Sequence, residues 1–523
     1  MSTMKKLNFL LLFLALSFAA SLRAQGPYLE ALYDVQVTQN QVYGENATIL
    51  PVLFQQTTEA VPRPLVMDIY EPVGDNNEAR PVMLVFHTGN FLPFPQNNGT
   101  GGTIRDSTVV ELCTRLAQRG YVAASVDYRL GWNPVDPSQD IRKFFLINAA
   151  YRGVQDARTA VRYMRKLAVD EGNPYGIDPD KVGMWGIGTG GYITAAVATL
   201  DEYAEVVIPK FLINLGAGTV PMVIQPVNGD IYGTSVGIVP PGYPVLPAGD
   251  TLCYPNHVTY ADGSPISSDI RMVVNNGGAL GDISWIDENT IPWVSFQVPT
   301  DPFAPYTTGT LTVPGTGDPA DPSDDFAVVE VSGSFDVQAR LNELGINDLF
   351  NNIPAWAPED YSEVADSRNN GYNGLFPFPT GVIADSAPWD FYAADNANVP
   401  PNPPPDPVRA RMYWDTIMAY AGIRACIAMD LPCNFTSVKT LNASELNLKL
   451  APNPATDQVV ISADAEHNMR TIELYDVSGR LVNSFFSINS NQFTLPRNGA
   501  SPGIYFLRLR FEKGVVVQKL IFE

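Results

Sequence analysis

Residues 181–191 read KVGMWGIGTGG, and this stretch decides how the larger part of the chain folds. Its first five residues have the apolar character of a buried strand. Four glycines follow within the next six positions, which allows a tight turn, and a run of small residues at 195–200 predicts a helix. The stretch therefore predicts a strand that passes through a glycine-rich turn into a helix.

Strand and helix patterns alternate on both sides of this stretch. The predicted strands lie at 65–70, 82–86, 121–128, 271–274 and 292–296, and the predicted helices at 109–116, 149–168 and 409–428. Such alternation is typical of a mostly parallel sheet with helices on both faces. Residues 208–269 interrupt it, since they are rich in Gly, Pro and Val, and we expect an insertion over the strand ends that acts as a lid.

Composition and the N-terminus indicate an exported protein. The 523 residues suggest two or three domains, and the formal net charge of -22 argues against a nucleic-acid partner. Residues 1–24 have the pattern of a signal peptide: Lys5 and Lys6 precede an uncharged apolar run at 7–20, and Ala24 stands before the expected cut. The run is short for a membrane span, so we expect no transmembrane anchor, although an anchor is the alternative reading.

Four cysteines remain, and export permits them to form disulfides. Three full pairings are possible, of which the short separation favours Cys426 with Cys433. Cys113 and Cys253 complete the set. The spacings do not fit a zinc site, and the chain has only three histidines, so we expect no metal and no cofactor.

The chain changes character after a linker at 435–446. Short alternating strands follow over 447–523, which predicts a small all-β sandwich. Three stretches in it, LAPNPA at 450–455, LYDVSGR at 474–480 and PGIYF at 502–506, together with Lys519, resemble the type A sorting domain of the type IX secretion system of Bacteroidota. The resemblance implies cargo of the type IX machinery, secreted or held at the outer cell surface. An ordinary carbohydrate-binding sandwich is the alternative.

The larger part is predicted as a domain at 25–434 with an insertion at 208–269, and over about 64–433 outside the insertion it resembles the esterase and lipase branch of the α/β-hydrolase superfamily. The match is carried by HTGNF at 87–91, by the strand segment at 121–130, by the glycine-rich turn and by TDPFAPY at 300–306. The resemblance implies the α/β-hydrolase fold, a mostly parallel sheet flanked by helices. In the family, the loop holding His87, Thr88 and Gly89 forms an oxyanion hole.

The family's nucleophile turn reads Gly-x-Ser-x-Gly, and here Gly188 occupies the serine position. Thr189 is the alternative nucleophile, but it would shift the register by one and place a β-branched residue where φ is positive. In the unshifted register Thr189 offers its backbone N–H, which with those near Thr88 and Gly89 would form an anion-binding nest.

The triad acid and base are the other two requirements of ester hydrolysis. Asp301 follows a predicted strand in the position of the family's acid. The family's histidine follows the acid, but no histidine lies between Asp301 and Cys433. His257, in the insertion, is the alternative base, provided that it reaches over the strand ends.

We therefore expect an exported hydrolase homologue that is catalytically impaired and binds a small-molecule or polymer ligand in its cleft. Whether it is an enzyme stays open. One alternative is an active carboxylic-ester hydrolase that uses Thr189 or His257. The other is a surface adhesion or scaffold protein that uses the fold only as a shape.

Overall fold

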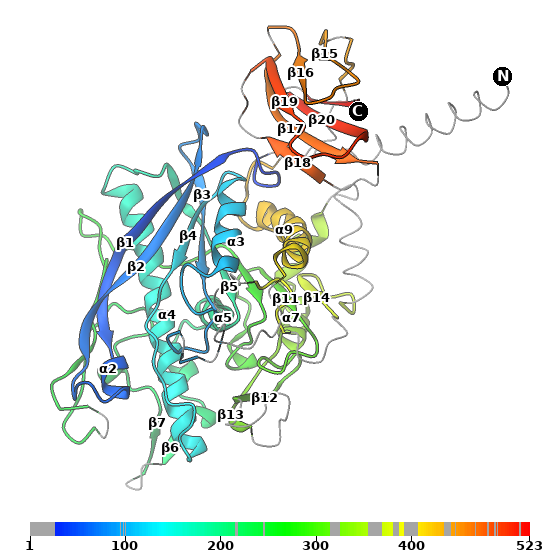
Figure 1. Cartoon of the computed structure of the whole chain (residues 1–523). Helices are drawn as coiled ribbons and strands as arrows, with labels where there is room; N and C mark the ends of the chain where they lie inside the picture. The colour runs from blue at the N-terminus through cyan, green and yellow to red at the C-terminus, as the bar shows by residue number, and fades with distance from the viewer. Residues whose placement is uncertain are drawn as a thin grey trace.

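The fold is seen in a computed structural model of the chain (Figure 1). The described residues are 27–94, 96–97, 99, 101–214, 218–243, 246–313, 325–353, 369–379, 386–391, 406–433, 441–444, 446–465, 467–477, 481–485, 488, 490–511 and 514–523. The predicted signal peptide and most of the predicted linker lie outside them.

An eight-stranded sheet forms the centre of the larger domain, with the strand order β1-β2-β4-β3-β5-β10-β11-β14. In that order the strands are Asp34–Thr48, Val61–Val73, Val122–Val126, Arg80–Phe86, Ile177–Ile187, Val273–Asn276, Trp293–Gln297 and Leu375–Pro377. The first two pairings are antiparallel, and every pairing from β4 to β14 is parallel. The glycine-rich turn thus follows a central strand, β5.

Helices cover both faces of this sheet, as predicted. The long helices are α3 (Ser107–Ala117), α4 (Gln139–Val169), α5 (Thr189–Thr199), α7 (Ser334–Glu343) and α9 (Pro407–Ala428). Along β3, Val82, Leu84 and Phe86 pack in one core with α4 and α5, whereas Met83 and Val85 pack in another with α3 and α9. The alternation of β3 side chains between two apolar layers is what a strand buried on both faces requires.

Helix α4 is buried on both of its faces, and this was not evident from its sequence. The expected apolar face, Val154, Ala157, Val161 and Met164, lies in the core. The other face carries a polar stripe at helical spacing that bonds to backbone carbonyls. The stripe consists of Asn148, Tyr151, Gln155, Arg158, Arg162 and Arg165.

The insertion supplies those carbonyls, and so it is not the lid that the sequence predicts. Gln155 Nε2 donates to the carbonyls of Asn228 and Asp230, each at 2.8 Å. Arg162 reaches the carbonyl of Tyr232 at 2.7 Å. The described insertion packs as a third layer against the outer face of α4, because buried carbonyls need donors and the stripe provides them. Its elements are η2 (Pro209–Phe211), β6 (Leu212–Asn214), β7 (Thr219–Pro221), α6 (Gln225–Asn228), β8 (Gly237–Ile238) and β9 (Thr251–Cys253), and η1 (Tyr203–Val206) comes just before it.

A buried ion pair joins the sheet to α4 and to the insertion. Arg129, just after β4, pairs with Asp156 of α4 at 2.9 Å, and both side chains are fully buried. Arg129 Nη1 also donates to the carbonyl of Leu252 at 2.9 Å and to Asn46 Oδ1 at 3.0 Å. The pair is thus surrounded by further hydrogen bonds, which buried charges require.

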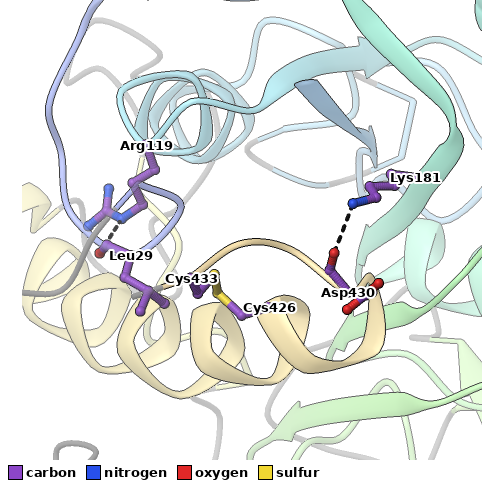
Figure 2. The surroundings of a disulfide bond; sticks show 6 residues. All are labelled: Leu29, Arg119, Lys181, Cys426, Asp430 and Cys433. Atoms are coloured by element: carbon purple, nitrogen blue, oxygen red, sulfur yellow. Dashed lines mark hydrogen bonds between the residues drawn. A yellow bond between two sulfur atoms is a disulfide. The ribbon is translucent and has the colours of Figure 1, made fainter. Parts of the chain in front are cut away.

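The predicted disulfide between Cys426 and Cys433 is confirmed (Figure 2). It ties the last turn of α9 to the chain that follows. Within the intervening loop, the carbonyl of Asp430 accepts from Lys181 Nζ at 2.8 Å, which fixes the loop against β5 (Figure 2). Cys113 and Cys253 are free and buried.

The C-terminal domain consists of a three-stranded sheet, β15-β16-β19, and a four-stranded sheet, β18-β17-β20-β21, around a shared apolar core. The strands are β15 (Lys449–Ala451), β16 (Gln458–Ser462), β17 (Met469–Asp476), β18 (Leu481–Phe485), β19 (Gln492–Pro496), β20 (Gly503–Phe511) and β21 (Gly514–Phe522). All described pairings within the two sheets are antiparallel. Nowhere in the described chain is a helix both long and apolar enough to cross a membrane.

The polar stripe yields a stability prediction. Arg162→Met should lower the free energy of unfolding by about 3 kcal/mol, since it leaves several buried carbonyls without their donor. Lys166→Met, on a half-buried residue of the same helix, serves as the matched control and should cost less than about 1 kcal/mol. Urea denaturation followed by circular dichroism measures both, and equal losses would show that the stripe does not secure the insertion.

Candidate functional site

The glycine-rich turn forms a sharp corner between β5 and α5. Gly188 stands at its apex with φ 52° and ψ -113°, and caps the N-terminus of α5. A β-carbon on Gly190 would come closer than 3.0 Å to the carbonyl oxygen of Phe86, and one on Gly186 would come as close to the carbonyl of Gly190. Backbone crowding therefore requires the flanking glycines, and the positive φ lies at residue 188 rather than at residue 189.

Thr88 fills the space in front of Gly188. A β-carbon built on Gly188 would lie closer than 3.0 Å to Thr88 Oγ1 and 3.0 Å from Thr88 Cβ. Both residues are half-buried. A hydroxyl thus reaches the front of the turn, but it comes from the loop after β3.

Thr189 holds that loop in place. It is the first residue of α5 and is buried, and its Oγ1 accepts a hydrogen bond from the Asn90 N–H at 2.7 Å. Gly89, with φ 125°, lets the loop pass close to the backbone of Gly102. The side chain of Thr189 therefore connects the two segments that the sequence predicted to form the site.

His87 is a structural residue of the same loop. It is fully buried, its Nδ1 lies 2.5 Å from the Thr88 carbonyl, and the Tyr128 ring stacks on it at 4.5 Å. Its Nε2 lies 3.7 Å from Asp127 Oδ1. These contacts fix the ring inside the protein.

Asp301 lies in the loop after β11, as predicted. Its Oδ1 accepts from the N–H groups of Phe303 and Ala304, at 2.8 and 3.3 Å. Burial raises the pKa of the Asp301 carboxyl to about 7, and those two hydrogen bonds only partly oppose the effect. The carboxyl lies beside Gly277, next to Asn276, whose carbonyl accepts from Gly188 N–H at 2.7 Å.

Two residues that the sequence did not single out stand near this carboxyl. Trp389, from the segment after β14, is fully buried, and its Cζ2 and Asp301 Oδ2 both lie within 4 Å of a β-carbon built on Gly277. Tyr192 lies on the first turn of α5, and burial together with the Asp301 charge raises the pKa of its hydroxyl. Among the described residues, neither the Trp389 indole N–H nor the Tyr192 hydroxyl has a hydrogen-bond partner.

The structure does not bring His257 into this group. Its Nε2 lies 2.9 Å from the carbonyl of Tyr43 in β1, and its ring packs 5.4 Å from that of Tyr163. The charges of Lys166 and Glu171, at the end of α4, act on it, and burial lowers its pKa. Helix α4 ends shortly before β5 begins. His257 therefore lies toward the N-terminal end of β5, whereas Gly188 follows its C-terminal end.

A separate cavity of about 220 Å³ also lies away from the Gly188 turn, where α5 ends and β11 begins. It is lined by the end of α5, by Tyr232 and Asp269 of the insertion region, and by the turn before β11. In the described part of the chain, no cluster of three or more His, Cys, Asp or Glu side chains is placed to hold a metal ion.

Two family models match the chain. Residues 67–215, which span β3, β5 and the turn, match the BD-FAE family, and residues 449–523 match the secretion system C-terminal sorting domain. The matched part of the larger domain is similar to the esterase-like α/β-hydrolases of that family, and the C-terminal domain is similar to type IX sorting domains. The sorting domain implies export by the type IX machinery to the cell surface or the extracellular space.

Solved structures similar to this chain include esterase 2 of the planctomycete Thermogutta terrifontis. Its propionate-bound form is 14% identical, with 77% of this chain and 97% of that chain covered and a TM-score of 0.32. Its native form is 14% identical, with 78% and 95% covered and a TM-score of 0.33. The form phosphorylated by paraoxon is 15% identical, with 66% and 82% covered and a TM-score of 0.29. No curated protein matches the chain.

The crowding at Gly188 can be measured by a double-mutant cycle. Gly188→Ala should destabilise the protein by about 3 kcal/mol, from positive-φ strain and from contact with Thr88. In a Thr88→Gly background the same substitution should cost at least about 1 kcal/mol less. Urea unfolding of all four proteins gives the coupling, and additive effects would show that Thr88 does not fill this space.

The raised pKa of Asp301 predicts a pH dependence of stability. In the folded state the Asp301 carboxyl keeps its proton up to about pH 7, whereas the usual pKa of an aspartate is 3.8. The free energy of unfolding should therefore fall as the pH rises between these values. Asp301→Asn should therefore raise Tm at about pH 8 more than at about pH 5. Asp34→Asn, on an exposed residue of β1, is the control for thermal unfolding at both pH values. If Asp301→Asn shifted Tm equally at both pH values, the prediction of a raised Asp301 pKa would be wrong.

Proposed function

We propose that this protein is an exported hydrolase homologue that binds a ligand at the Gly188 turn and lacks serine-type ester hydrolysis. The observation that carries the proposal is the apex of the turn, where Gly188 has no side chain and Thr88 takes the space that one would need. Acyl transfer in this fold requires a hydroxyl on that apex, activated by a histidine.

The missing base supports the same conclusion. The chain has no histidine after Asp301 until His467, which belongs to the sorting domain. Trp389 comes from the segment after the last strand of the sheet and, like Asp301, has an atom within 4 Å of a β-carbon built on Gly277. An indole N–H is a donor only and takes no proton, so it does not replace a general base.

The remaining groups are suited to binding. Asp301 has a raised pKa, so near neutral pH a large fraction of its carboxyl is protonated and donates a hydrogen bond. The Trp389 N–H and the Tyr192 hydroxyl are buried donors without acceptors among the described residues. Buried donors gain most from an acceptor, which favours a ligand that presents oxygen atoms.

The two alternative functions remain open to test. Thr189 would need to give up its bond with Asn90 before it attacks an ester, and His257 contacts Tyr43 instead of the turn. These contacts favour the binding role over an active esterase. If the protein is an adhesion or scaffold protein, no ligand binds at the turn. A ligand screen that compares wild type with Asp301→Asn distinguishes this alternative from ligand binding at the turn.

Esterase assays and an active-site probe test the proposal. Wild type should show no turnover of short p-nitrophenyl esters above background and no labelling by a fluorophosphonate. Gly188→Ser should also stay inactive, because no histidine is present to activate it. Thr199→Ala, on another hydroxyl of α5, is the matched control for Thr189→Ala. Robust wild-type turnover that Thr189→Ala abolishes and Thr199→Ala does not would overturn the proposal.

A further inference from the structure

The cavity of about 220 Å³ at the C-terminal end of α5 has walls from four parts of the larger domain. They are Arg158 of α4, the last turn of α5, Tyr232 and Ser268 of the insertion, and the turn before β11. The volume equals that of roughly seven waters at about 30 Å³ each. The cavity therefore admits a small organic molecule, but not one of drug size.

The cavity carries more negative than positive charge. Its lining includes three carboxylates and one guanidinium, which belong to Asp201, Asp269, Asp287 and Arg158. The Asp287 carboxylate is engaged within its own turn, since it accepts from the Asn289 N–H at 2.9 Å. Asp201 and Asp269 are exposed at the rim, and within the described chain their carboxylates have neither a hydrogen bond nor an ion pair. These two carboxylates are therefore available to a cationic group of a ligand.

The inside of the cavity offers polar groups of another kind. Arg158 is 3% exposed, and its Nη groups donate to backbone carbonyls, among them that of Ile231 at 3.1 Å and that of Leu200 at the end of α5. Its Nε–H has no acceptor in the part of the chain that the structure describes. Ser268 is 7% exposed, and among the described residues its hydroxyl has no hydrogen-bond partner either. Buried polar groups without partners gain most from a ligand atom that satisfies them.

The charges around Arg158 decide which ligand atom suits the inside. The Arg158 guanidinium carbon lies 4.3 Å from the centre of the Tyr232 ring, whose hydroxyl donates to the Asp201 carbonyl at 3.0 Å. Burial lowers the pKa of Arg158, and the charges of Asp269 and Asp201 are among those that oppose this effect. A ligand carboxylate or phosphate beside Arg158 would thus be repelled by two like charges. A neutral oxygen, such as that of a hydroxyl group, avoids this repulsion.

We propose that this cavity is a second ligand-binding site and that it takes a small amine carrying hydroxyl groups. The ammonium group pairs with Asp201 and Asp269 at the rim, and a hydroxyl group bonds to Arg158 Nε and to Ser268 inside. An amino sugar has this combination of groups. Helix α5 has 11 residues, so about 16 Å of helix separates this site from the Gly188 turn.

Calorimetric titration of the full chain with D-glucosamine tests the proposal. At about pH 6 the amine is protonated, and saturable binding is expected. D-glucose has the same ring without the amine, and cyclohexylamine has the amine without the hydroxyl groups. Each should bind at least roughly fivefold more weakly than D-glucosamine, because each lacks one of the two sets of contacts.

Variants of the lining locate the binding. Asp201→Asn with Asp269→Asn should weaken binding of D-glucosamine roughly fivefold, because the ammonium loses both carboxylates. Asp34→Asn with Glu59→Gln is the matched control, since it removes the same charge from exposed residues outside the cavity, and it should bind like wild type. Ala198→Phe, on the last turn of α5, should abolish binding because the ring fills the cavity.

Circular dichroism melts show whether each variant is folded. The proposal is overturned if D-glucosamine shows no saturable binding to wild type, or if D-glucose or cyclohexylamine binds as tightly as D-glucosamine. Full binding by an Ala198→Phe protein that melts cooperatively also overturns it, since the amine would then bind elsewhere.

Discussion

The close approach of three backbones at the end of β5 is the constraint on which the site depends. Gly190 lies against the carbonyl of Phe86 at the end of β3, and Gly191 lies against Gly278, just after β10. A side chain at either position would push α5 away from the sheet. The same contact brings the loop after β3 to the front of the turn, so the position of Thr88 follows from the packing of glycines behind it.

Much of this arrangement could be predicted from the sequence. The flanking glycines, the alternation of strands and helices, and the closely spaced cysteines are local patterns with a direct physical meaning. The placement of the insertion could not be predicted, because the polar stripe of α4 has the spacing of a solvent-exposed face. The sequence around Trp389 and Tyr192 does not show that these residues lie near Asp301. Their positions depend on the paths of the segments that follow three separate strands.

The site combines the architecture of a hydrolase with groups of a different chemical character. Asp301 follows β11, where the resemblance predicts the triad acid, yet an indole shares its surroundings at Gly277 and its carboxyl is not paired with an imidazole. Such a carboxyl is costly to ionise. The surroundings thus favour the neutral, protonated form of this carboxyl. Fold and chemistry are separable here, as they are in other large fold families.

The polar stripe of α4 has a kinetic consequence for this domain. Lid motions that control substrate access in microseconds to milliseconds require a segment with few buried contacts. The insertion is instead bonded through its carbonyls to Gln155, Arg158, Arg162 and Arg165, and lifting it would leave buried guanidinium groups without acceptors. The insertion should therefore open only together with the domain.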